Sequence, residues 1–257
     1  MKLLDGRDIA GFITQRHIGQ ASSLPVRPRL AIIRSQDNEA GDKYLKMKRQ
    51  YGQSVGVVVD LFIETSASIL DRIAALNADP AVTGIIVQLP LSDDAITDRA
   101  LAAIAPVKDV DGLGPNSPYE AATPKAILWL LAAHNVDLKG RIVVVGQGRL
   151  IGKPLADRLE ASGREVVRCD IHTKNLKAEA IQADILIVCT GQKHLITPDM
   201  VKDGAVVIDT GSPSPEVDPA IFGRPDVIVT PNPGGVGPMT VVSLFDNLLI
   251  AAQNRRI

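Results

Sequence analysis

Three polar side chains that could hold or move protons lie at the ends of short apolar runs, or face such ends, in the first half of the sequence. They are Lys48, Gln88 and Asp111. Tyr44 precedes Lys48 by four residues, so on a helix the two share one face and would direct a ring and an ammonium into the same cleft. A lysine that snorkels beside a half-buried tyrosine is the alternative interpretation.

Gln88 and the acidic segment 108–112 carry the other two candidate groups. Gln88 ends the apolar run Gly84–Val87 and precedes Leu89-Pro90-Leu91, so its amide leaves the sheet where strand pairing must stop. A neutral amide there can orient a neighbouring group, or it can cap backbone groups at the strand end. In Lys108-Asp109-Val110-Asp111-Gly112, an extended backbone would place both carboxylates on one side. An acidic turn on the surface is the alternative.

A glycine-rich turn in the second half has the setting of a nucleotide-binding loop. The apolar run RIVVV enters this turn and a helix is expected directly after it. Glycines in such a turn let the backbone approach a pyrophosphate at the helix N-terminus. A purely structural turn between strand and helix is the alternative, because such turns are common. The candidate residues of the turn are Gly146, Gln147, Gly148, Arg149 and Gly152.

Two further fragments strengthen the nucleotide hypothesis. Asp170 ends the next predicted strand, where an acidic residue can accept hydrogen bonds from an adenosine ribose and repel a 2'-phosphate. Its alternative role is to cap the following turn. Thr190 and Gly191 follow the third buried strand of this half and would bring backbone close to the same cofactor.

The apolar runs that must position these residues are short, rich in β-branched residues and separated by stretches of helical period. This alternation predicts an α/β protein with mainly parallel sheets. We expect two domains: residues 1–122, joined by a C-terminal helix over 240–257, and a Rossmann-like domain over 123–239. Thr123 is predicted to cap the helix that begins the second domain.

Composition excludes several classes of partner. The 28 basic and 29 acidic residues are mixed along the chain, which argues against nucleic acid. The N-terminal stretch is charged throughout and no apolar run is long enough to span a bilayer, so a cytoplasmic protein is expected. Cys169 and Cys189 lie in apolar runs and are predicted to be free thiols, and the four histidines are too scattered to suggest a metal.

Across nearly its whole length the chain resembles the bifunctional methylenetetrahydrofolate dehydrogenase/methenyltetrahydrofolate cyclohydrolases. The most specific match is the segment from Thr230 to Thr240, TPNPGGVGPMT. Further matches, in the family's order, are Tyr44-x-x-x-Lys48, Val87–Leu91, Lys108–Gly112, Gly152-Lys153-Pro154, Ala183-Asp184-Ile185 and Val207-Ile208-Asp209.

The resemblance implies a substrate cleft between two domains. In it, Tyr44 stacks on the folate ring, Asp111 anchors the pterin-like edge, and Lys48 is the catalytic lysine that Gln88 positions. The resemblance also implies that tetrahydrofolate derivatives are the substrates in one-carbon metabolism, that no metal is used and that the protein is a homodimer. The segment PGGVGPM is expected to be a flexible lining that contacts both ligands, through the substrate-binding residues Pro233, Gly234 and Gly235 and the cofactor-binding residue Gly237. Ile171 is a further implied cofactor contact.

Departures from the family leave the dinucleotide open between NADP and NAD. Gly146-Gln147-Gly148 replaces the usual Gly-Arg-Ser, and Cys169-Asp170-Ile171 replaces Cys-His-Ser, so groups expected to hold a 2'-phosphate are missing. Arg149, Lys174 or Arg168 could substitute for them, but Asp170 would oppose a phosphate. Two other functions remain open: a dehydrogenase without cyclohydrolase activity, and a silent nucleotide-binding homologue.

Overall fold

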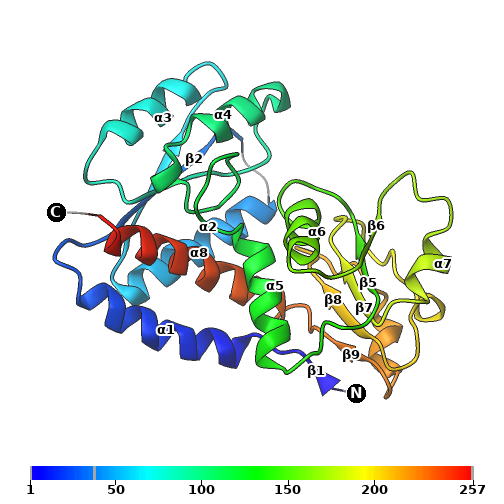
Figure 1. Cartoon of the computed structure of the whole chain (residues 1–257). Coiled ribbons are helices and arrows are strands. Elements are labelled where there is room, and N and C mark those ends of the chain that lie inside the picture. Colours follow the sequence, from blue (N-terminus) through cyan, green and yellow to red (C-terminus); the bar gives the residue numbers. More distant parts are fainter. Residues whose placement is uncertain (1, 37–38, 256–257) are drawn as a thin grey trace. The chain divides into compact units, whose positions relative to one another are not determined.

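The structure, a computed structural model, describes residues 2–36 and 39–255. The chain divides into two compact units (Figure 1). The six-stranded unit consists of Met1–Ala10 and Thr123–Thr240, and the three-stranded unit of Gly11–Ala122 and Val241–Ile257. Residues 1–10 therefore group with the second half of the chain and not, as the sequence suggested, with the first. The reason is that Lys2 and Leu3 pair with Ile228 and Val229 at a sheet edge.

The six-stranded unit contains one wholly parallel sheet with the strand order β1-β9-β8-β7-β5-β6. Its strands are β1 (Lys2–Leu3), β5 (Ile142–Val145), β6 (Val166–Cys169), β7 (Ile185–Val188), β8 (Val206–Asp209) and β9 (Ile228–Val229). Its helices are α6 (Gly152–Ala161) and α7 (Leu176–Ala180), with the 3-10 helices η3 (Pro198–Met200) and η4 (Pro219–Gly223) and most of α5 (Ala122–Ala133).

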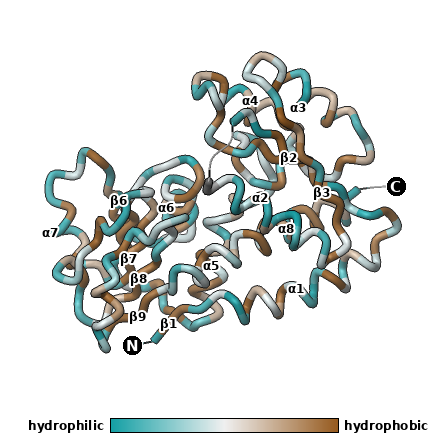
Figure 2. Tube along the Cα trace, turned by 180° about the vertical axis from the view of Figure 1, so that it is seen from behind, coloured by the Kyte–Doolittle hydropathy of each residue, from teal (hydrophilic) through white to brown (hydrophobic). Residues whose placement is uncertain are grey.

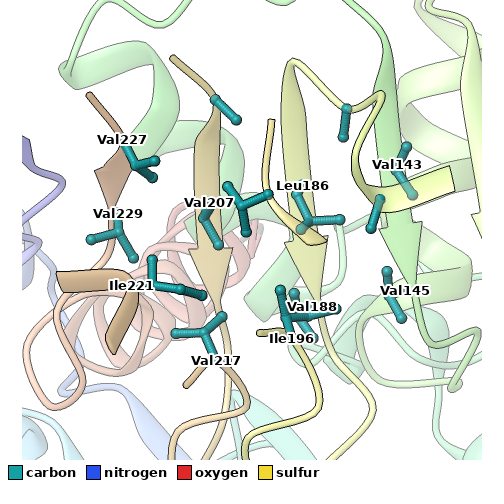
Figure 3. Close-up of a cluster of buried hydrophobic side chains, with 14 of the residues drawn as sticks. Val143, Val145, Leu186, Val188, Ile196, Val207, Val217, Ile221, Val227 and Val229 are labelled. Carbon is teal, nitrogen blue, oxygen red and sulfur yellow. The ribbon is translucent and has the colours of Figure 1, made fainter. Parts of the chain in front are cut away.

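Short runs of valine, isoleucine and leucine form the centre of this sheet. Strands β5, β7 and β8 are buried at every residue, as expected of parallel strands covered on both faces. Figure 3 shows one of the resulting layers, in which side chains of adjacent strands pack in rows across the sheet. The labelled members are Val143, Val145, Leu186, Val188, Ile196, Val207, Val217, Ile221, Val227 and Val229.

The three-stranded unit has a smaller parallel sheet with the order β3-β2-β4. Its strands are β2 (Arg29–Arg34), β3 (Val58–Ile63) and β4 (Gly84–Val87). Its helices are α1 (Arg7–Ser22, from Gly11 onward), α2 (Glu39–Val55), α3 (Ile69–Ala78), α4 (Thr97–Ala103) and α8 (Val236–Gln253, from Val241 onward), with the 3-10 helices η1 (Asp94–Ile96) and η2 (Pro106–Lys108). One apolar cluster joins the sheet to α2 and α8, and another joins it to α3 and α4.

The prediction of an α/β fold with parallel sheets is confirmed, with differences at individual elements. The sequence analysis missed α1, whose hydrophobic and hydrophilic residues alternate (Figure 2) and whose Phe12 is 78% exposed. Helix α5 begins at Ala122, so Thr123 lies inside the helix and is not its N-cap. Helix α7 spans only five residues.

Helix α8 is long and apolar enough to cross a membrane by length and composition alone. However, 67% of its most apolar window is buried inside the protein. Ser243 and Asn247 on this helix are also buried, and both donate hydrogen bonds to backbone carbonyls of the segment 110–122. These contacts are typical of a core helix.

Candidate active site

Lys48 and Gln88 are in direct contact in the three-stranded unit. Gln88 follows the last residue of β4, and its backbone N–H donates to Ile33 O of β2 at 2.8 Å, which fixes it at the carboxyl edge of the sheet. Lys48 lies on α2, and its Nζ donates to Gln88 Oε1 at 2.8 Å. Lys48 is only 7% exposed, and this burial lowers the pKa of its ammonium. The family resemblance implies that Gln88 positions Lys48, and the two side chains are in contact.

Asp111 is electrostatically coupled to Lys48. Burial raises the pKa of Asp111 to about 6, and the nearby Lys48 ammonium opposes this rise. In return, the Asp111 carboxylate raises the pKa of Lys48 against the effect of burial. The structure thus brings an ammonium, an amide and a carboxylate into one site, and both ionisable groups have pKa values displaced toward neutrality, as is common where protons are exchanged.

The backbone that carries Asp111 is not extended, so the reasoning that placed two carboxylates side by side is wrong. Residues 106–108 form the 3-10 helix η2, and a turn follows at 110–111. The Asp109 carboxylate is 1% exposed and accepts a hydrogen bond from Gly114 N at 2.8 Å. Asp109 therefore stabilises the loop that follows it, whereas Asp111 lies near Lys48.

Lys108 anchors the other end of this loop. Its buried Nζ donates to three carbonyl oxygens at the C-terminus of α3, Leu76 O and Asn77 O at 2.8 Å and Asp79 O at 2.7 Å. A cation suits this helix end because the last carbonyls lack intrahelical partners. The side chain of Asn247 on α8 holds the same loop by donating to Val110 O and Glu120 O at 2.9 Å.

We expect Lys108→Met to lower the free energy of unfolding by about 2–4 kcal/mol, because three buried carbonyls would lose a charged donor. Chemical denaturation monitored by circular dichroism measures this loss. Lys46→Met, at an exposed position of α2, is the control and should change stability by less than about 0.5 kcal/mol. Equal stabilities of the two variants would contradict the anchoring role.

Tyr44 and Tyr51, which lie on either side of Lys48 along α2, have different surroundings. Tyr44 is half-buried one turn before Lys48 on α2. The Tyr51 hydroxyl lies 2.8 Å from His17 Nδ1, and its ring packs edge-on against Phe245 with 4.8 Å between ring centroids. Tyr51 is therefore part of the core between helices, whereas Tyr44 lies on α2 one turn from Lys48.

In the glycine-rich turn after β5, in the six-stranded unit, backbone segments pass very close to one another. Gly146 has a φ of 97°, and a Cβ on it would lie 2.5 Å from Cys189 O. A Cβ on Gly152, the first residue of α6, would lie 1.8 Å from Gly146 O. Only glycine fits at either position. The turn thus presents bare backbone at a helix N-terminus, which fits a dinucleotide pyrophosphate.

The ends of β5, β6 and β7 meet at this turn. Val145 pairs with Cys169 and with Val188, so Gly146, Asp170 and Cys189 each follow paired residues at one sheet edge. The chain runs from β5 to β6 on one side and then to β7 on the other. This reversal is the switch point at which open α/β sheets bind ligands.

The predicted cofactor residues near β6 lie on the surface, and their contacts bear on dinucleotide choice. Asp170 Oδ1 accepts a hydrogen bond from His172 N at 2.8 Å, so Asp170 does cap the next turn. Ile171 is 85% exposed. The Arg168 guanidinium forms ion pairs with Asp157 and Glu160 at 2.7 and 2.6 Å. Arg168 is therefore already engaged in ion pairs. Lys174 and Arg149 are exposed residues near the same sheet edge.

Gln147, which replaces the family's usual arginine, turns back toward β5. Its Nε2 donates to Val144 O and Gly146 O, both at 3.1 Å, and so braces the glycine turn. Gly148 has open space where a Cβ would be, so its side of the turn is uncrowded.

Thr190 and Gly191 lie at the predicted sheet edge, but their donors already have a protein partner. Thr190 N, Thr190 Oγ1 and Gly191 N donate to Glu216 Oε2 at 2.6, 2.6 and 3.0 Å. Sequence reasoning missed Glu216 because it lies in an irregular segment after β8. Its placement depends on Asp209, whose carboxylate accepts from the backbone N–H of Gly211, Glu216 and Val217.

The segment PGGVGPM packs closely against Thr230 and the N-terminal segment. Helix α8 begins at Val236, earlier than expected, which puts Gly237 in its first turn. A Cβ on Gly235 would lie 2.7 Å from Thr230 Cβ, and Gly234 has a φ of 121° beside the Arg7 side chain. Pro233 is exposed. Gly6 N also donates to Gly234 O at 2.9 Å, so the N-terminal segment holds this turn.

Among residues 2–36 and 39–255, no group of three or more His, Cys, Asp or Glu side chains could hold a metal ion. The burial of Cys189 raises the pKa of its thiol to about 12. The candidate chemistry of the described residues therefore rests on Lys48, Asp111 and the sheet edge around Gly146.

Comparison with known proteins finds relatives for both halves of the chain. Residues 4–111 match the catalytic domain of tetrahydrofolate dehydrogenase/cyclohydrolase, and residues 121–256 match its NAD(P)-binding domain. The chain is 37% identical to the bifunctional protein FolD of Wolinella succinogenes, over 100% of this chain and 98% of that protein. The crystal structure of the bifunctional FolD enzyme from Campylobacter jejuni is 33% identical, covers 100% of both chains and has a TM-score of 0.91.

A structure of the Trypanosoma brucei methylenetetrahydrofolate dehydrogenase-cyclohydrolase, complexed with NADP and an inhibitor, is 27% identical with a TM-score of 0.90 and covers 98% of this chain and 97% of that one. The two matched domains together span almost the whole sequence. The chain therefore belongs to the tetrahydrofolate dehydrogenase/cyclohydrolase family.

Proposed function

We propose that this protein oxidises 5,10-methylenetetrahydrofolate to 5,10-methenyltetrahydrofolate with a nicotinamide dinucleotide, and hydrolyses the product to 10-formyltetrahydrofolate. The observation that carries this proposal is the buried Lys48–Gln88 pair beside Asp111 in a chain that matches both domains of the family. A cytoplasmic homodimer active in one-carbon metabolism is part of the same proposal.

For the oxidation, the protein supplies binding and orientation. When bound, a nicotinamide dinucleotide would supply the hydride acceptor for oxidation of the methylene carbon. Gly146 and Gly152 form the turn that would cradle its pyrophosphate, and the backbone after β7 lies at the same sheet edge. Tyr44 offers a ring face for stacking on the folate, and Asp111 offers carboxylate oxygens to donors on its pterin-like edge. Pro233, Gly234 and Gly235 are further proposed substrate contacts.

For the hydrolysis, Lys48 is the group that moves protons. Burial lowers the pKa of Lys48, and a cationic methenyl substrate beside it would lower that pKa further. The neutral amine then accepts a proton from the water that adds to the methenyl carbon, and returns it to the ring nitrogen as the carbon–nitrogen bond breaks. The remaining hydroxyl proton leaves to solvent as the formyl carbonyl forms, so the reaction releases one proton overall. Gln88 stays uncharged throughout, so it can hold Lys48 Nζ in both protonation states.

The direct test of the hydrolysis uses methenyltetrahydrofolate alone, without any dinucleotide. We expect the purified protein to convert it to 10-formyltetrahydrofolate well above the spontaneous rate. A rate equal to the spontaneous one, alongside working hydride transfer, would favour the dehydrogenase without cyclohydrolase activity.

We further propose that NAD is preferred to NADP. Asp170 lies at the end of β6, where a carboxylate accepts from ribose hydroxyls and repels a 2'-phosphate. Arg168, the nearest cation in sequence, is held by Asp157 and Glu160. Lys174, which is exposed, is then a candidate for binding a phosphate.

We expect Asp170→Ser to raise kcat/KM with NADP relative to NAD by roughly tenfold, because a repulsive charge is removed. Steady-state kinetics with both dinucleotides measures this ratio. Asp203→Asn removes an exposed carboxylate from the same unit and should leave the ratio unchanged. An unchanged ratio in Asp170→Ser would mean that Asp170 does not read the ribose.

A further inference from the structure

Glu216 is a buried acid at the switch point of the six-stranded sheet. It is 2% exposed. Glu216 Oε2 accepts hydrogen bonds from the backbone N–H groups of Thr190 and Gly191 and from the Thr190 hydroxyl. The two contacts with Thr190 are only 2.6 Å long, as expected for hydrogen bonds to an ionised carboxylate. Burial raises the pKa of Glu216, and these donors oppose that rise.

A second buried carboxylate, that of Asp209, lies beside Glu216. The backbone N–H of Glu216 donates to Asp209 Oδ2 at 3.0 Å, and Asp209 is 3% exposed. Within the part of the chain that the structure describes, neither carboxylate forms an ion pair with Lys, Arg or His. Backbone amides stabilise the negative charge here without neutralising it.

The position of Glu216 indicates which half of a bound dinucleotide its charge would lie near. Asp170, at the end of β6, lies where the adenosine ribose is expected, and the turn after β5 lies where the pyrophosphate is expected. Strand β7 is on the opposite side of β5 from β6. A dinucleotide that crosses this edge therefore brings its nicotinamide half toward the end of β7, where Glu216 holds Thr190 and Gly191.

We propose that Glu216 is a specificity-determining residue whose buried negative charge favours the oxidised nicotinamide, which is positively charged, over the neutral reduced form. This inference rests on the dinucleotide site of the proposed function but not on the folate chemistry. The reduced ring carries no charge, so the negative charge of Glu216 should change its binding little. The effect is therefore selective for the oxidised ring. The protein would bind the cofactor best in the form that the oxidation consumes.

The test measures dissociation constants of NAD and NADH by calorimetry, without folate. In Glu216→Gln, which keeps an acceptor for Thr190 and Gly191, we expect the constant for NAD to rise roughly tenfold and that for NADH to change less than about twofold. Glu216→Asp keeps the charge but shortens the side chain, so it should leave the ratio of the two constants unchanged. Asp203→Asn is the control for a lost surface carboxylate.

Thermal unfolding checks that each variant folds. If Glu216→Gln does not fold, Glu216→Asn replaces it and is compared with Glu216→Asp, its charged match in size, with the same selective loss of NAD expected. Equal weakening of both dinucleotides in the amide variants would overturn the inference and leave Glu216 a purely structural residue. If wild-type protein bound neither dinucleotide, the site itself would be wrong. Normal binding without folate turnover would overturn only the proposed reaction.

Discussion

Replacing Lys48 by methionine is expected to lower the cyclohydrolase rate by about 10²–10⁴-fold, the usual contribution of a positioned acid–base group. Methionine keeps most of the bulk that fills the site next to Gln88, but it carries no proton. Hydride transfer depends mainly on geometry, so a measurable part of the dehydrogenase rate should remain. Separate assays of the two steps, on methylene and methenyl substrates, measure this division.

Lys46→Met is the matched control, because Lys46 is exposed two residues away on the same helix. It should leave both rates within about twofold of wild type. If Lys48→Met folded normally and lost both activities equally, Lys48 would be a binding residue for both steps and not the proton carrier of the second.

Replacing Asp111 by asparagine is expected to weaken folate binding and to stabilise the protein. Loss of a charged acceptor for the substrate should raise KM roughly 10–100-fold. The pKa of Asp111 is raised from 3.8 to about 6, so ionising it costs free energy in the folded state. Because the side chain is only half-buried, solvent reduces that cost, and we expect a gain of about 1–2 kcal/mol in unfolding free energy at pH 7.

The sign of the pH dependence gives this prediction a second readout. Above about pH 6 the wild-type carboxylate is ionised in the folded state and the full cost is present. Below the ordinary pKa of 3.8 it is protonated in both states and the cost vanishes. The advantage of Asp111→Asn should therefore shrink as the pH falls from 6 to below 4. A constant advantage, or one equal to that of the exposed-site control Asp71→Asn, would contradict the raised pKa.

Elements with strong patterns could be predicted from the sequence, because burial on both faces of a parallel sheet leaves uninterrupted runs of β-branched residues. Strands β5, β7 and β8 are of this kind. Helix α1 was missed because exposed Phe12 interrupts its apolar pattern. Strand β1 was missed because two residues, Lys2 and Leu3, form an edge only once β9 is in place.

The candidate site, too, could be predicted from the sequence only in part. Lys48 and Gln88 could be paired in advance, since one lies on a helix face and the other ends a strand. The motif 108–112 has three charged side chains that look alike in sequence, yet Lys108 and Asp109 bind backbone groups and only Asp111 is coupled to Lys48. Glu216 lies in no regular element, and its role depends on contacts 25 and 26 residues away in the chain.

The most direct test of the proposed function is turnover of methylenetetrahydrofolate by the purified protein, with NAD and NADP in parallel and with the methenyl and formyl products both recorded. We expect methenyl product to form and to be opened to 10-formyltetrahydrofolate in the same reaction, faster with NAD than with NADP. No product with either dinucleotide, from a folded protein that still binds them, would contradict the assignment and indicate a silent member of the family.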